Sequence, residues 1–134
     1  MVDPAIVKEW FSKADEDFKF AEVNLKEGRN YFPQICFHFQ QAAEKYLKSF
    51  IIAHELKFSK IHDLEQLLEA CLQNEEQLKE IKDECAFLDG FYVDTRYPVH
   101  WPVHYTRNEA EKAHDAAMKI RELVKNLLDT ILRT

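Results

Sequence analysis

The sequence predicts an all-α fold: one domain over residues 1–134, folded as an antiparallel up-and-down bundle of four long helices plus one short helix. Along most of the chain, apolar residues recur at steps of three and four, which places them on one face of a helix. No segment shows the alternation of apolar and polar residues that is typical of a strand. Only 2 glycines and 4 prolines occur among the 134 residues, too few for turn-rich β architectures.

The first helix is expected to begin at Asp3 and Pro4, because aspartate is a favoured N-cap and proline fits the first helical position. Its apolar stripe runs from Val7 to Leu25. Gly28 is expected to end the helix, because glycine adopts the left-handed conformation found after helix C-termini at low cost.

The second helix is expected to open near Pro33 and to run to about Leu56. Apolar residues occupy successive positions in it, as at residues 50–53, and cannot all face one seam at ~100° per residue. A central position would cover them, and so would a partner chain; the sequence therefore predicts a homodimer with this helix at the interface. One strip of the helix is polar, which indicates a solvated face or a set of ion pairs. Its residues are His38, Gln41, Glu44, Lys45 and Lys48.

Two more helices are expected before the longest break in the pattern. A short helix covers about residues 63–72. The fourth helix is expected to start at Asn74, because Gln77 three residues later completes a capping box. Its apolar stripe ends at Tyr92.

The break itself covers residues 93–105, where Pro98 and Pro102 prevent a continuous helix. A second capping box at Thr106 and Glu109 marks the start of the last helix. That helix is expected to continue to Ile131, because its apolar residues keep steps of three and four.

Charge and cysteine content narrow the class of protein. The formal net charge of −6, from 18 Lys and Arg against 24 Asp and Glu, argues against a protein that coats nucleic acid by bulk charge. The 3 cysteines are odd in number and lack Cys-x-x-Cys spacing, so buried structural thiols are expected rather than disulfides or a zinc site. There is no signal-peptide core and no run near ~18 apolar residues, so a reduced, cytoplasmic environment and no membrane segment are expected.

The break over residues 93–105 is the candidate ligand-binding segment, because it gathers cationic and aromatic side chains on an acidic chain. An arginine presents a planar fork to phosphate, aromatic rings stack on bases, and histidines exchange protons near neutral pH. Two lysines of the second helix would add positive charge if the fold brings them close. The candidate ligand-binding residues are Arg96, Tyr97, His100, Trp101, His104, Lys45 and Lys48.

The composition of the same segment, taken alone, favours a structural role, in which Tyr97, Trp101 and Tyr105 seal the end of the bundle. A metal site is not expected, since Pro102 lies between His100 and His104 and disrupts the helical spacing of a ligand pair. The sequence also contains no glycine-rich phosphate loop. No cofactor is therefore expected.

Three segments, in this order, carry a resemblance to a known family. They are FHFQQAAEKYLKSF, KIHDLEQLLEAC and YVDTRYPVHW, followed by a long last helix. Together they resemble the HEPN domain, a name that abbreviates higher eukaryotes and prokaryotes nucleotide-binding. The resemblance implies a helical bundle that pairs into a homodimer, with a minimal nucleotidyltransferase encoded beside it or fused to it in many cases.

The resemblance also implies that some relatives are metal-independent ribonucleases of toxin–antitoxin or defence systems. Those use an Arg and a His with about four to six residues between them, often with a polar residue directly after the Arg. From Arg96, 3 residues intervene before His100 and 7 before His104. Arg107 and His114 match the pattern, with 6 residues between them and an Asn after the Arg.

Three functions follow from these features. The first is a non-catalytic HEPN module that binds a nucleotide, RNA or another phosphate ligand and partners a nucleotidyltransferase. The alternative is a ribonuclease, with catalytic candidates Arg96, His100 and His104, or Arg107 and His114. The third is a dimerisation module that binds no ligand.

Overall fold

A computed structural model describes residues 2–57, 62–96 and 105–134 of the chain. Every regular element within these ranges is a helix, which confirms the all-α prediction. In chain order the elements are α1 (Pro4–Lys26), α2 (Phe32–Ala53), α3 (Leu64–Leu72), the 3-10 helix η1 (Glu76–Ile81), α4 (Lys82–Arg96), α5 (Arg107–Leu127) and α6 (Asp129–Leu132).

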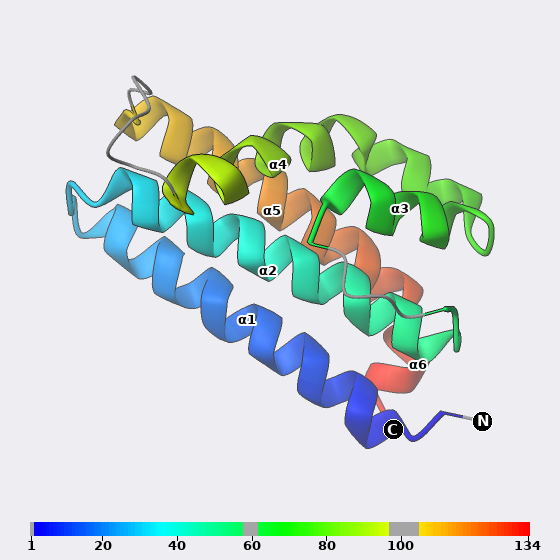
Figure 1. The fold of residues 1–134 in the computed structure, drawn as a ribbon. Coiled ribbons are helices and arrows are strands. Elements are labelled where there is room, and N and C mark those ends of the chain that lie inside the picture. The colour runs from blue at the N-terminus through cyan, green and yellow to red at the C-terminus, as the bar shows by residue number, and fades with distance from the viewer. Residues whose placement is uncertain (1, 58–61, 97–104) are drawn as a thin grey trace.

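Helix α2 is the central element of the bundle and packs against α1, α3, α4 and α5 (Figure 1). Helices α1 and α2 run antiparallel, and α1 forms one edge of the molecule (Figure 1). The C-terminal α6 packs back against α1, and the Lys8 ammonium donates to the backbone carbonyl of Thr134. The bundle is thus a layered arrangement around one buried helix.

The central position of α2 explains its apolar character. In α2, 14 of the 22 residues are buried, and Phe50 and Ile51 are each only 1% exposed. These side chains are covered by helices of the same chain. Of the successive apolar residues at positions 50–53, Ile52 is half-buried and the other three are buried within the chain, so this run does not by itself require a partner molecule.

The start and end of α1 are as the sequence predicts. The Asp3 carboxylate accepts a hydrogen bond from the backbone N–H of Ala5 at 2.9 Å, and Pro4 is the first helical residue. Gly28 follows the helix with a φ of 73°, in the left-handed region that favours glycine. The predicted apolar stripe is entirely buried: Val7, Phe11, Ala14, Phe18, Ala21 and Leu25.

Four boundaries differ from the predictions. Helix α2 ends at Ala53 rather than at about Leu56. The capping residue after α3 is Glu75 rather than Asn74, because the Glu75 carboxylate accepts from the backbone N–H of Gln77 at 3.3 Å and opens η1. Helix α4 continues to Arg96, past the start of the predicted break. Helix α5 ends at Leu127 rather than continuing to Ile131, and the next residue, Leu128, with a ψ of 10°, turns the chain so that α6 can reach α1.

Two carboxylates accept hydrogen bonds from the first backbone N–H groups of α3. Asp63 is the N-cap of α3, and its carboxylate accepts from the backbone N–H of Glu65 at 2.9 Å. Asp89 of α4 accepts from the N–H of Leu64 at 2.6 Å and from that of Glu65 at 3.1 Å. Burial raises the pKa of Asp89 to about 6, although the two backbone hydrogen bonds act to lower it. The neighbouring Asp63 carboxyl adds to the rise.

This raised pKa predicts an unusual dependence of stability on pH. The folded chain binds the Asp89 proton more tightly than the unfolded chain, whose carboxyl titrates near 3.8. The contribution of this group to the free energy of unfolding should therefore fall as pH rises from 3.8 to about 6. Urea unfolding of the parent chain and of Asp89→Asn across this range tests it. A difference between the two proteins that is constant with pH would contradict it.

Candidate functional site

Most of the predicted ligand-binding segment lies outside the described residues. This applies to Tyr97, His100, Trp101 and His104, and to the side chain of Arg96. The backbone of Arg96 ends α4, and Tyr105 resumes the described chain just before α5. The segment therefore joins α4 to α5, and its two ends are described.

At the α5 end, Tyr105 packs into the bundle. Its ring lies 5.7 Å from that of Phe91, which in turn lies 5.2 Å from the ring of Phe87 in an edge-on arrangement. A row of aromatic rings thus follows α4 up to the segment. The structure thus supports a role for Tyr105 in sealing the end of the bundle.

The first residue of α5, Arg107, connects α5 to the end of α1. Its guanidinium donates to the backbone carbonyl of Leu25 at 3.3 Å and lies 5.6 Å from the ring centre of Phe32. Thr106 accepts from the N–H of Glu109 at 3.3 Å, as the predicted capping box requires. Arg107 is thus held by contacts within the chain.

His114, two turns along α5, is held more firmly. Its Nε2 lies 2.8 Å from a carboxylate oxygen of Glu22, and its Nδ1 lies 3.1 Å from one of Asp115. Its ring packs against Phe18 and Phe39 at 5.4 and 5.5 Å. Both ring nitrogens thus contact carboxylates of the same chain, so a substrate proton could reach one of them only if that contact were broken.

Arg107 and His114 nevertheless line one surface hollow of 220 Å³ between α1 and α5. The other lining residues are Glu22, Leu25, Lys26 and Glu111. Two cations face two carboxylates there if His114 is neutral, so a phosphate would meet no net positive charge. The two residues are seven positions apart and therefore lie on a similar face of α5.

Lys45, also predicted to bind a ligand, extends from α2 toward α1. Its ammonium donates to a carboxylate oxygen of Asp17 at 2.5 Å, and the Nδ1 of His38 lies 3.3 Å from the other oxygen. Burial opposes ionisation of Asp17, but these two partners lower its pKa. Lys45 is still 31% exposed and borders a hollow of 370 Å³ with Glu9, Trp10 and Lys13.

Lys48 is not on a solvated face, because it is buried. Its ammonium donates to Glu44 at 2.9 Å, and the side chains of the two are only 7% and 5% exposed. Glu44 also contacts Nδ1 of His62 at 3.1 Å, and the Lys48 nitrogen lies 6.0 Å from the Trp10 ring centre. Lys48 and Glu44 thus form a buried ion pair that joins α2 to α1 and to the start of α3.

Comparison with known proteins identifies the family to which this fold belongs. The HEPN domain model matches residues 7–127. The chain belongs to the HEPN family. It is similar to the crystal structure of TT1696 from Thermus thermophilus, with a TM-score of 0.79 and 30% identity over 90% of this chain and 96% of that one.

Two further proteins are similar to this chain. The crystal structure of ST0689, described as an archaeal HEPN homologue, has a TM-score of 0.74 and 28% identity over 91% of this chain and 97% of that one. "Putative toxin MJ1304" of Methanocaldococcus jannaschii is 26% identical over 135 residues, which cover 90% of this chain and 87% of the relative. The family resemblance seen in the sequence is confirmed.

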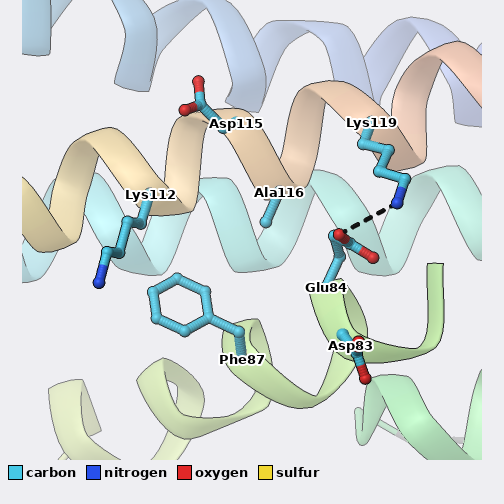
Figure 2. A pocket seen from close by; sticks show the side chains of 7 residues that line it. All are labelled: Asp83, Glu84, Phe87, Lys112, Asp115, Ala116 and Lys119. Atoms are coloured by element: carbon cyan, nitrogen blue, oxygen red, sulfur yellow. Dashed lines mark hydrogen bonds and ion pairs between the residues drawn. The ribbon is translucent and has the colours of Figure 1, made fainter.

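This HEPN domain has another hollow, of 340 Å³ between α4 and α5, which the sequence did not indicate. Figure 2 shows the Phe87 ring beside Lys112, and Glu84 paired with Lys119 at 3.2 Å. The other carboxylate oxygen of Glu84 is buried and has no hydrogen-bond partner among the described residues. The one signal in the sequence was the two lysines seven residues apart on α5.

The thiols of this HEPN domain are structural. Cys36, Cys71 and Cys85 are free and buried, as predicted, and burial raises the pKa of Cys36 and of Cys71 to about 12. In the described ranges no group of three or more His, Cys, Asp and Glu is placed to hold a metal ion. None of the helices in those ranges is long and apolar enough to span a membrane.

Proposed function

We propose that this HEPN domain is a non-catalytic, homodimeric module that binds a nucleotide or another phosphate ligand and works with a minimal nucleotidyltransferase. One observation carries the non-catalytic assignment. Among the described residues, the Arg–His pair with the ribonuclease spacing is Arg107 and His114, and both side chains are engaged within the chain. A general base needs a ring nitrogen that is unprotonated and accessible.

The proposed ligand site is the segment that joins α4 to α5. Arg96 would bind phosphate, Tyr97 or Trp101 would stack on a base, and His100 and His104 would supply further donors. The segment ends at the N-terminus of α5, whose helix dipole favours a bound anion. The two lysines are not part of the proposed site, because Lys45 is paired with Asp17 at the hollow between α1 and α2, and the buried Lys48 is paired with Glu44.

The partner and compartment are also proposals. Membership of the HEPN family supports a nucleotidyltransferase partner, and a relative named as a toxin supports a toxin–antitoxin setting. Three free, buried thiols are consistent with a reducing compartment such as the cytoplasm.

Metal-independent RNA cleavage is the second candidate function. It is favoured by the toxin name of the relative and by the shared hollow of Arg107 and His114. In that reaction a histidine would take the proton from a ribose 2′-hydroxyl, whose oxygen would attack phosphorus and expel the 5′-oxygen. The arginine would stabilise charge on the phosphorus-centred transition state. The product would carry a cyclic phosphate.

A calorimetric titration with nucleoside mono- and triphosphates tests the first proposal. We expect a heat of binding that Arg96→Ala reduces at least tenfold in affinity, because it removes a charge-assisted bond to phosphate. The matched control is Arg133→Ala on the exposed C-terminal helix, which should bind as the parent chain does. Equal affinities for Arg96→Ala and the parent would contradict the site.

The same preparations separate the three functions when incubated with single-stranded RNA in excess chelator. The first proposal expects intact RNA. Cleavage that is lost in His114→Ala would establish the ribonuclease instead. A chain that binds neither nucleotides nor RNA would be the dimerisation module.

A further inference from the structure

Exposed apolar side chains concentrate at α1. Among the described residues, five large hydrophobic side chains are exposed, and four of them belong to α1 or to the turn after it. These four are Ile6 (46%), Phe20 (52%), Val23 (50%) and Tyr31 (58%). The fifth, Phe87, lies on α4. Because α2 is covered by its own chain, α1 is the element with apolar surface left over for a partner.

One stripe of α1 runs along its flank beside α2. Ile6, Trp10, Lys13, Asp17 and Phe20 follow one another at steps of four and three, so they share a face. The buried stripe that starts at Val7 occupies a different face. Helix α1 forms one edge of the bundle (Figure 1), and Ile6 and Phe20 at the two ends of this stripe are each about half exposed.

The stripe carries a projection and a hollow. The projection is Phe20, whose ring lies against His38 at 4.6 Å but is still half exposed. The hollow is the 370 Å³ space lined by Glu9, Trp10, Lys13 and Lys45. The two are ten residues apart, which is ~15 Å along the helix. A ring of this size fits the hollow of another molecule but cannot reach its own.

The order of residues along the stripe is self-complementary. Rotating a second α1 by a half turn about a point midway between Lys13 and Asp17 makes the two helices antiparallel. The partner's Phe20 then falls opposite Trp10, and the partner's Asp17 falls opposite Lys13. The symmetry repeats both pairs, so the aromatic rings and the charges are each matched twice.

We propose that this outer stripe of α1 is the interface between two copies of the chain, in which Phe20 of each copy inserts into the Trp10 hollow of the other. The proposal rests on the homodimer of the proposed function and identifies its surface. An anionic ligand fits the hollow less well. Lys45 is paired with Asp17, and Lys13 lies 3.6 Å from Glu16, so little net positive charge remains.

Sedimentation equilibrium at micromolar concentration tests the interface. We expect a mass near twice 15.9 kDa for the parent chain. Phe20→Asp should weaken dimerisation by roughly a hundredfold or more, because each dimer loses the buried ring twice. The matched control is Phe87→Asp, which changes an exposed phenylalanine on α4 and should leave the dimer intact. Circular dichroism confirms that each variant is folded.

The outcomes separate the surface from the dimer itself. A parent chain of 15.9 kDa at every concentration would overturn both the homodimer and its interface. A dimer that persists in Phe20→Asp, or that Phe87→Asp dissociates, would overturn the α1 interface while the homodimer stands.

Cross-linking gives a test that does not depend on weakening the dimer. Lys13→Cys places one exposed thiol close to the proposed two-fold axis, whereas the three natural thiols are buried. A short thiol-specific cross-linker should then yield a covalent dimer. Lys82→Cys, at the exposed start of α4, should not. Equal yields from the two variants, or none from Lys13→Cys, would contradict the interface.

Discussion

Glu44→Ala is expected to lower the free energy of unfolding by about 3–5 kcal/mol, because it removes one partner of a buried ion pair. The Lys48 side chain is only 7% exposed and donates to Glu44 at 2.9 Å. The same carboxylate contacts His62, so its removal also loosens the start of α3. Urea unfolding followed by circular dichroism measures the loss.

Two controls identify burial as the cause. Glu44→Leu combined with Lys48→Met removes both charges, and it should restore most of the loss because no unpaired charge remains. Glu76→Ala breaks a shorter ion pair, 2.6 Å to Lys79, but both side chains are more than half exposed. It should barely move the midpoint, since solvent screens that pair. If the Glu44 and Glu76 variants lost equal stability, burial would not be the deciding factor.

The helices could be predicted from the sequence because their signals are local. The Asp3 cap, the apolar stripe of α1 and the Thr106 cap each depend on residues within a few turns of one another. The misplaced boundary at Glu75 shows the limit of such signals. Two adjacent residues were both able to cap, and the neighbouring structure decided between them.

The site was less predictable because it depends on contacts between distant residues. Spacing alone indicated that Arg107 and His114 share a face of α5. It could not show that the carboxylate of Glu22, 92 residues away in the chain, contacts the Nε2 of His114. The prediction of a solvated polar strip on α2 was wrong at Glu44 and Lys48 for the same reason. Their spacing is typical of an exposed ion pair, but α1 and the start of α3 cover them in the fold.

The Trp10 hollow had no signal that sequence reasoning could have used. Trp10 and Lys45 lie on different helices, and a hollow exists only where the surfaces of α1 and α2 diverge. The exposed side chains of α1 were equally hidden, because periodicity separates apolar from polar faces but does not report the exposure of a flanking residue such as Phe20.

The other large effect is expected for Phe39→Ala, at about 3–5 kcal/mol of unfolding free energy. Phe39 lies on the central α2 and is fully buried, with its ring 5.4 Å from Phe18 and 5.5 Å from the His114 ring. Removing it leaves a cavity where α1, α2 and α5 meet. The backbone of a helix that is packed on several sides can relax only partly into that space.

Phe87→Ala is the matched control, because it removes the same side chain from a site that is 36% exposed and should cost clearly less than Phe39→Ala. Phe39→Leu refines the test, since it keeps most of the buried volume and should recover over half of the loss. Urea unfolding of the three variants measures both comparisons. A loss for Phe39→Ala as small as that for Phe87→Ala would mean that α2 is not the packed centre of the bundle. The Phe39 ring would then not hold the His114 ring firmly in place at the Arg107–His114 hollow.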